Sequence, residues 1–457
     1  MPNAAPLNPI NLKGEAAPAP SLQDVYADEL IVGRPLEFPL YDDQGVLLLA
    51  SGAVITSEVR RLLSSRGNGR VRMHASDVRQ VTLQAFAGMG GGGVLAFDTE
   101  LTRKLDQLCD TGVLEVVNKG PAVKDSVVIV GRKGYDAAQR QQLQEKHAQN
   151  DVALNQMMQE ALRGRSLDGR AVAGMAADYL QLLTADSDCV LASTPDMLKE
   201  GDLAARSLEV SLLSMALAIE MGMDAENVRD IGLIGMVHDW GMLRLPPKIR
   251  QLDRLLTAVE FLEVQRHPIH SLEILQQMTS LPKTVALVSY QIHEQPNGQG
   301  YPRGRSANSI HPFAHVIHVA DSYLALTAVR PHRPALMPYA AMECMLWQGK
   351  EGVVDRKAVK ALLQVLSLFP LKSFVALSDG TVARVMRRSP KSYATPIVLR
   401  IQNSDGTAAD PMDDDNLIDL AESPLKVQQA LPTPGSGEVA MSPEFLKQTR
   451  GAGRGRA

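Results

Sequence analysis

Between about residues 152 and 368 the chain is dominated by segments in which apolar residues recur with helical spacing. Val152 to Leu162 and Val172 to Leu183 carry apolar residues three and four positions apart, a spacing that gathers them on one face of a helix. Leu208 to Met221 is apolar nearly all round, which indicates a helix at the centre of a helical core. The same pattern predicts further helices at residues 228–237, 259–278, 284–293 and 316–329. The middle of the chain is therefore expected to be an all-α bundle.

Shorter apolar runs, broken by turn residues, flank this helical stretch. Before it, strand-like runs meet a hairpin signal at Asp42-Asp43-Gln44-Gly45, and Ser57 to Leu63 is typical of a short helix. Val127 to Val130 is a candidate for a buried strand, and Tyr135 to His147 for a polar helix. After Pro370, strand-like runs and a Ser-Asp-Gly turn return.

These patterns predict a mainly α chain with smaller parts at both ends. We expect a helical domain over 151–370, an N-terminal α+β part over 26–150 and a β appendage over 371–423. The part over 26–150 contains a glycine-rich hinge at 88–93. Residues 1–25 and 424–457 have little to pack and are expected to be disordered tails.

Composition excludes several classes of protein. The formal net charge of −4 gives no basic field for a nucleic-acid polymer. The three cysteines form no disulfide framework and fit a reducing cytoplasm, where we expect the protein to reside. The N-terminus lacks the pattern of a signal peptide, and no apolar run reaches the roughly 18 residues needed to span a membrane.

Eight of the ten histidines fall between His238 and His332. His238-Asp239 lies at the end of a predicted apolar helix, so that an imidazole and a carboxylate can reach one metal ion. Asp321 from another helix can complete the site, and His267 and His293 can bind there or hold a second ion. Two metal ions together can activate water and stabilise the oxygens of a phosphoryl displacement. The cluster thus indicates metal-assisted phosphate chemistry, or a protein descended from it.

The ordered set of motifs resembles the HD-GYP family of metal-dependent phosphohydrolases over about residues 200–370. The motifs stand in the sequence as Val237-His238-Asp239-Trp240-Gly241, Arg266-His267-Pro268, His293-Glu294-x-x-Asn297-Gly298-x-Gly300-Tyr301-Pro302, Val319-Ala320-Asp321, Ala325-Leu326-Thr327 and Arg330-Pro331-x-Arg333. The resemblance implies an all-α fold that hydrolyses the bacterial second messenger cyclic di-GMP to pGpG or GMP, with iron or manganese as the metal.

By the same resemblance, residues of this chain receive roles. Asp239 is expected to be catalytic, and the expected metal ligands are His238, Asp239, His267, His293 and Asp321. The expected substrate-binding residues are Gly300, Tyr301, Pro302, Arg330 and Arg333. Packing of the loop remains an alternative role for Tyr301, and capping of a helix end for the two arginines.

Six positions depart from the family's pattern. Arg206 stands where the family has a metal-binding histidine, and Ile292 where it has the first histidine of a pair. A guanidinium does not bind a metal ion and repels it. The other departures are Met242 for lysine, Asn297 and Leu324 for aspartate, and Ser271 for glycine. The five remaining ligands suffice for one metal and are marginal for two.

Two interpretations of Arg206 stay open. Either it fills the place of a metal and pairs with Asp239 and Asp321, leaving a metal-free remnant, or it faces the substrate phosphate beside a single metal. The first predicts a catalytically inactive module that binds a nucleotide or a signalling protein through the Gly-Tyr-Pro loop; the second predicts a cyclic di-GMP phosphodiesterase with a reduced metal site. Hydrolysis of another nucleotide, formation of a homodimer, and an unrelated bundle with core histidines are further alternatives.

Overall fold

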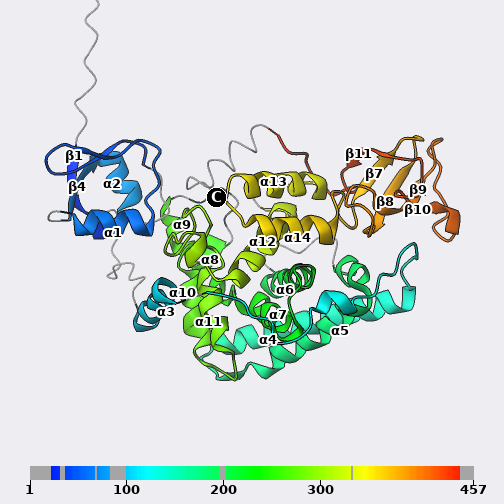
Figure 1. Cartoon of the computed structure of the whole chain (residues 1–457), viewed down its shortest axis with the longest axis horizontal. Helices are drawn as coiled ribbons and strands as arrows, with labels where there is room; N and C mark the ends of the chain where they lie inside the picture. The colour runs from blue at the N-terminus through cyan, green and yellow to red at the C-terminus, as the bar shows by residue number, and fades with distance from the viewer. Residues whose placement is uncertain are drawn as a thin grey trace, which may run out of the picture.

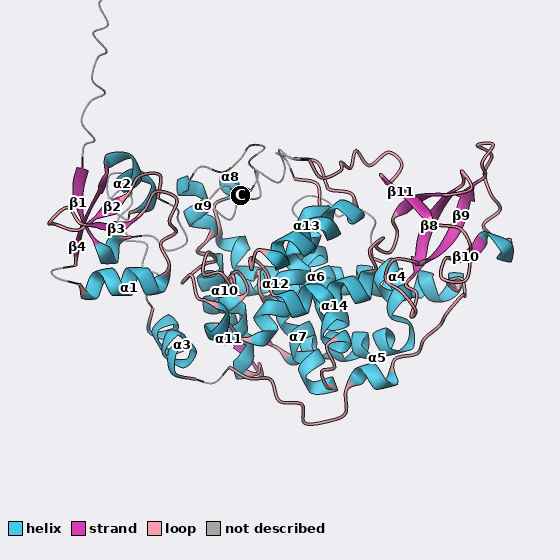
Figure 2. Ribbon diagram, turned by 45° about the horizontal axis from the view of Figure 1, so that its top comes forward, coloured by secondary structure: helices cyan, strands magenta, loops and turns pink. Residues whose placement is uncertain are grey.

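The structure is a computed structural model, and it describes residues 22–30, 36–66, 69–82, 99–112, 114–194, 202–250, 252, 254, 256, 258–330 and 333–442. Helices fill the middle of the molecule, and a small sheet lies at each end (Figures 1 and 2). The predicted mainly α fold class is confirmed. Residues 1–21 of the predicted N-terminal tail, the hinge at 88–93 and residues 443–457 lie outside the described residues.

The N-terminal sheet is antiparallel, with strand order β1-β4-β2-β3. Its strands and helices are β1 (Leu22–Tyr26), β2 (Leu40–Tyr41), β3 (Leu47–Leu49), β4 (Arg70–His74), α1 (Ser57–Ser65) and α2 (Ala75–Val81). The predicted turn joins β2 to β3, where the Asp42 carboxylate accepts hydrogen bonds from the amides of Gln44 and Val46. Strand β1 begins inside the predicted tail, because Val25 is buried in the core of this sheet.

The segment between the sheet and the bundle differs from the prediction. Val127 to Val130 forms no strand: it runs along the surface, with Val128 and Ile129 57% and 72% exposed. Apolar residues alone did not supply the strand partner that a buried strand needs. The predicted polar helix joins the next helix in α4 (Ala137–Leu162), which begins at the N-cap Asp136. The predicted boundary at 150/151 therefore falls inside one continuous helix.

The central bundle is built around α6 (Leu203–Glu220), which packs against α7 (Ala225–Val237) and α12 (Pro312–Thr327). Thirteen consecutive α6 positions, 207–219, include only one residue that is not buried, which agrees with the predicted central helix. The remaining helices are α5 (Arg170–Ala192), α8 (Pro247–Arg250), α9 (Ala258–Val264), α10 (His267–Leu275), α11 (Lys283–Gln291), α13 (Pro338–Lys350) and α14 (Arg356–Leu366). Strands β5 (Leu167–Asp168) and β6 (Met278–Thr279) form a short parallel pair at the edge of the bundle.

The C-terminal sheet is antiparallel, with strand order β10-β9-β8-β7-β11. Its strands are β7 (Phe374–Leu377), β8 (Val382–Arg387), β9 (Ile397–Gln402), β10 (Leu417–Asp419) and β11 (Val427–Leu431). Arg387 on β8 makes a bidentate ion pair with Asp186 on α5, at 2.7 and 2.9 Å, which ties the sheet to the bundle. Strand β11 corrects the predicted tail at 424, because it pairs with β7 and covers that edge of the sheet.

No helix among the described residues has the length and apolar character required to cross a bilayer.

Candidate metal centre

The end of α7 delivers His238 and Asp239 to the middle of the bundle. Close helix packing depends here on two glycines. A Cβ on Gly235 would lie 2.7 Å from the backbone of Ser211 on α6, and one on Gly241 would lie 2.0 Å from the carbonyl oxygen of His267. Only glycine therefore lets α10 approach the turn that follows Asp239, and this approach brings His267 to the pair.

Ser271, one of the departures from the family's pattern, fastens this contact. Its hydroxyl donates to the carbonyl oxygen of His238 at 2.5 Å and accepts from the amide of Gly241 at 2.9 Å. The side chain thus links α10 to the chain on either side of Asp239, and the serine at this position supports the site.

Three imidazoles present their Nε2 atoms to one carboxylate oxygen. Oδ1 of Asp239 lies 3.4 Å from Nε2 of His238, 3.1 Å from that of His267 and 3.3 Å from that of His293. The four residues come from three places in the chain: the end of α7, the first residue of α10, and the turn after α11. Burial, followed by repulsion from His267, lowers the pKa of His293 against the opposing effect of Asp239. Burial would raise the pKa of Asp239, but His238 and His267 hold it well below its ordinary value.

The backbone fixes the tautomers of two of these histidines. Nδ1 of His238 lies 2.9 Å from the carbonyl oxygen of Gly235, and Nδ1 of His267 lies 2.7 Å from that of Val264. Since a carbonyl only accepts, both Nδ1 atoms carry a proton, which leaves Nε2 as the nitrogen that faces Asp239 and that could bind a metal ion. Metal-binding histidines are oriented in this way.

One imidazole nitrogen of the centre has no hydrogen-bond partner in the described part of the chain, and two others face each other. Among the described residues, the buried Nε2 of His238 makes no hydrogen bond. The Nε2 atoms of His267 and His293 lie 2.8 Å apart, a contact in which one of the two must donate unless a cation lies between them. Ligand atoms of His238, Asp239 and His293 all lie within 4.8 Å of one another. Imidazole nitrogens and a carboxylate of this kind fit one transition-metal ion.

Asp321 stands beside this group and has a different partner. Nη2 of Arg206 on α6 lies 2.7 Å from Oδ1 of Asp321, and the two side chains are 16% and 13% exposed. Burial would raise the pKa of Asp321, but the Arg206 guanidinium holds it below its ordinary value. The structure thus brings four of the five predicted ligands together and gives the fifth to an arginine. Ile292, the other lost ligand position, is fully buried in the hydrophobic core.

The Gly-Tyr-Pro loop folds directly over the histidines. A Cβ on Gly300 would lie 2.3–2.5 Å from the backbone of residues 293–295, so a larger residue would push the loop away. The ring of Tyr301 stacks on His293, with centroids 4.9 Å apart and planes 13° apart, and meets His267 edge-on at 6.0 Å. Burial raises the pKa of Tyr301 well above its ordinary value. Pro302 is buried next to it.

The two arginines after α12 have different surroundings. Arg333 donates to the carbonyl oxygens of Ala325, Leu326 and Pro334, at 2.6, 3.3 and 3.1 Å, and so caps the end of α12. Burial, followed by repulsion from Arg206, lowers the pKa of Arg330 to about 10. Arg206 and Asp321 thus act on the charge of Arg330 in opposite directions.

Sequence reasoning missed a second group of charged residues around the same loop. Arg303 and Arg305 follow the Gly-Tyr-Pro motif and bind acidic residues of α3 (Glu100–Thr111). The signal was present as Asp106 and Asp110, one helical turn apart, and as Arg303-x-Arg305. Nothing in the sequence connects two segments separated by almost 200 positions.

Comparisons with known proteins identify a matching family and several relatives. The sequence model of the HD domain family matches residues 137–358. The chain is 26% identical over 248 residues to cyclic di-GMP phosphodiesterase PA4108 of Pseudomonas aeruginosa, covering 54% of this chain and 59% of that protein. It is 32% identical over 158 residues to 3'3'-cGAMP-specific phosphodiesterase 1 of Vibrio cholerae, covering 35% and 36%. The match thus spans less than two thirds of the length of either relative.

Among solved structures, the chain is similar to Bd1817, an HDG"Y"P protein from Bdellovibrio bacteriovorus. The TM-score is 0.41 at 16% sequence identity, and the alignment covers 76% of this chain and 99% of that one.

Proposed function

We propose that this chain, which matches the HD domain family over residues 137–358 and resembles its HD-GYP type, is a metal-dependent phosphodiesterase of cyclic dinucleotides with one metal ion. The observation that carries the proposal is the convergence of three Nε2 atoms on Oδ1 of Asp239. Two of those rings have their other nitrogen bound to a backbone carbonyl. HD domains are metal-dependent, and the donor set fits an ion such as iron or manganese.

We assign the metal to His238, Asp239, His267 and His293. A divalent ion held there supplies Lewis-acid chemistry to the hydrolysis of a phosphodiester. Asp321 is committed to Arg206, so a second ion lacks the carboxylate that it would need. The Arg206 guanidinium instead supplies fixed positive charge on that side, and Arg330 adds to it.

The proposed substrate is a cyclic dinucleotide, with cyclic di-GMP as the first candidate. The relatives named above are phosphodiesterases of cyclic di-GMP and of 3'3'-cGAMP. In the reaction, water adds across one P–O3' bond: its hydroxyl goes to phosphorus and a proton to the 3' oxygen. The product from cyclic di-GMP is linear pGpG. In this proposal Arg206 and Arg330 neutralise the phosphate, and Tyr301, which stacks on His293, stacks on a base of the substrate. Because cyclic dinucleotides of this kind are bacterial second messengers, we place the proposed activity in the cytoplasm.

One observation favours a second candidate function. Tyr301 stacks on His293, and the Arg206–Asp321 pair is only 16% and 13% exposed, so side chains of the protein cover much of this region. A non-catalytic module would keep this closed arrangement and bind a nucleotide or a signalling protein through the Gly300-Tyr301-Pro302 surface. A homodimer formed through that surface belongs to the same alternative.

Turnover by the full-length chain tests the proposal. The wild type, loaded with iron or manganese, is expected to convert cyclic di-GMP or 3'3'-cGAMP to the linear dinucleotide. His267→Gln is expected to lower kcat/KM by at least about 100-fold, since even residues behind metal ligands contribute 10–100-fold. His270→Gln is the matched control, because His270 lies on the same helix and faces Glu273 instead. Equal turnover in the two variants would contradict the assignment of His267 to the metal. No turnover in the loaded wild type would favour the non-catalytic module.

A further inference from the structure

Helix α3 lies outside the matched HD domain and still packs against it. The helix begins at the N-cap Thr99, whose hydroxyl accepts from the amide of Thr102. Leu105, 6% exposed, packs in a small core with Ile269 and Leu272 of α10 and Tyr290 of α11. Along the chain, α3 stands between the N-terminal sheet and the bundle (Figure 1). It therefore joins the part before the HD domain to the two helices that precede His293.

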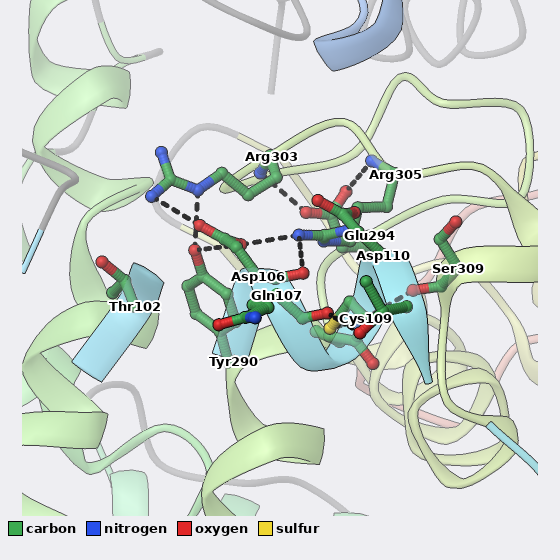
Figure 3. Close-up of polar contacts among 12 residues, drawn as sticks. Thr102, Asp106, Gln107, Cys109, Asp110, Tyr290, Glu294, Arg303, Arg305 and Ser309 are labelled. Atoms are coloured by element: carbon green, nitrogen blue, oxygen red, sulfur yellow. Dashed lines mark hydrogen bonds and ion pairs between the residues drawn. The ribbon is translucent and has the colours of Figure 1, made fainter. Parts of the chain in front are cut away.

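One carboxylate of α3 forms ion pairs with both arginines that follow the Gly-Tyr-Pro motif. Oδ2 of Asp106 lies 2.9 Å from Nη2 of Arg303, and Oδ1 lies 2.7 Å from Nη2 of Arg305. The hydroxyl of Tyr290 also donates to Oδ1, at 3.1 Å. Figure 3 shows Asp106 pointing from α3 into the space between these side chains. The two arginine side chains are 9% and 7% exposed, so the Asp106 carboxylate balances positive charge that has little access to water.

Asp110, one turn further along α3, makes a weaker contact of the same kind. It lies 2.6 Å from Nη1 of Arg305, and its side chain is 65% exposed. Water competes for an exposed carboxylate, so this pair contributes less than the buried one.

Arg303 and Arg305 also bind the loop over residues 294–305 through their backbone amides. Their two amides donate to the Glu294 carboxylate, each at 2.7 Å. Glu294 is buried and directly follows His293, and burial raises its pKa to about 7. The amide of Tyr301 donates to the carbonyl oxygen of His293 at 3.0 Å. The loop over residues 294–305 is thus fastened to His293 at one end and to Asp106 at the other.

We propose that Asp106 is a positioning residue for the metal centre, acting through the loop over residues 294–305. Removing its charge takes a carboxylate partner from each of two buried guanidinium groups, and breaking a buried ion pair is costly. Arg303 and Arg305 then turn toward water and draw their amides away from Glu294. His293 and Tyr301 lose their fixed orientation as a result. The site of this chain is therefore completed by a helix from outside its HD domain.

Helix α3 thus connects the N-terminal part of the chain to the loop that holds His293 and Tyr301. Thr56, the N-cap of α1, lies against Gly298 in the same loop: its methyl group is 3.3 Å from where a Cβ on that glycine would stand. The N-terminal part thus reaches the loop directly through Thr56 and along the chain through α3. Any input that shifts α3 would reach His293 by this route.

Amide hydrogen exchange of the full-length chain tests the positioning role without requiring turnover. In Asp106→Asn, exchange of the peptides covering 294–305 is expected to rise at least tenfold, while α6 and α7 remain as protected as in the wild type. Asp106→Glu should restore most of the protection, and Asp110→Asn should have a smaller effect in the same peptides. Glu100→Gln is the matched control, because Glu100 is on α3, is 83% exposed and pairs with Lys104 on the same helix.

A kinetic measurement accompanies the exchange experiment and rests on the proposed function. With saturating metal, Asp106→Asn is expected to lower kcat for the cyclic dinucleotide at least tenfold with a smaller change in KM, because His293 is misplaced. Unchanged exchange over 294–305 in Asp106→Asn, or an equal rise in every helix, would overturn the positioning role even in an active enzyme. Selective exchange in a chain without turnover would support the positioning role and count against the proposed function alone.

Discussion

Nη2 of Arg206 on α6 lies 2.7 Å from Oδ1 of Asp321 on α12, across the interface between the two helices. The guanidinium stands where the HD-GYP pattern expects a histidine ligand, and it occupies the carboxylate that a second metal ion would use. The cluster of His238, Asp239, His267 and His293 lies beside this pair and retains its own donors. Arg206 thus separates the expected centre into an ion pair and the cluster to which we assign a single metal.

Returning the family's residue at this position should restore a second metal. In Arg206→His, Asp321 is released and an imidazole is added, so bound metal is expected to rise from about one to about two equivalents per chain. Elemental analysis of the purified protein measures this, with the exposed Arg229→His on α7 as the control. A content that stays at one equivalent would show that Arg206 does not limit the number of ions.

Removing the guanidinium without replacing it should destabilise the bundle. Arg206→Met leaves the buried Asp321 carboxylate unpaired, and breaking a buried pair costs about 3 kcal/mol or more. Urea unfolding of metal-free protein measures the change. The double variant Arg206→Met/Asp321→Asn should recover a large part of the loss, and a double variant as unstable as the single one would contradict this account of the pair.

The approach of α10 should depend on Gly241. In Gly241→Ala the new methyl group would meet the carbonyl oxygen of His267 at 2.0 Å, which forces α10 and its first residue away from Asp239. We expect a loss of about 1–3 kcal/mol of stability together with weaker metal binding. Gly174→Ala is the control, since Gly174 on α5 has open space around it and should gain up to about 1 kcal/mol. Unchanged metal affinity in Gly241→Ala would count against this packing argument.

Buried histidines outside the metal centre should make the protein sensitive to acid. Burial lowers the pKa of His147 to about 4 and that of His311 to about 4. Below about pH 6.5 the unfolded chain therefore binds protons at these histidines that the folded protein does not bind. The free energy of unfolding consequently falls as the pH falls from about 6.5 toward 4. In His147→Gln, which keeps a polar partner for Tyr179, the free energy of unfolding should fall less between pH 7 and 5. Identical pH dependence of the two proteins would refute the assignment.

Helical spacing and the ordered motifs predicted the parts of the fold that depend on local pattern. Residues 208–221 were expected to lie at the centre of the bundle, and α6 lies there with almost all its side chains buried. His238, Asp239, His267 and His293 were expected to meet, and they do. The direction of Arg206 was one of two alternatives, because a helix start in sequence does not reveal which way a long side chain turns.

The remainder depended on contacts between distant segments. Val127 to Val130 has the composition of a strand but no neighbouring strand to pair with, whereas Val427 to Leu431 lies in a segment expected to be disordered and pairs with β7. Asp106 and Arg305 are 199 positions apart, and neither belongs to a recognisable motif. Pairings of this kind are set by tertiary packing, which a single sequence does not encode in its local pattern.

The metal content of the full-length chain tests the central claim most directly. The wild type, purified without chelator and reconstituted without oxygen, is expected to hold one equivalent of iron or manganese per chain, and His238→Ala should hold almost none. No metal in the wild type after reconstitution, or the same metal content in His238→Ala, would contradict the one-metal centre. A wild type without metal would place the Arg206–Asp321 pair in a binding module without metal-dependent hydrolysis.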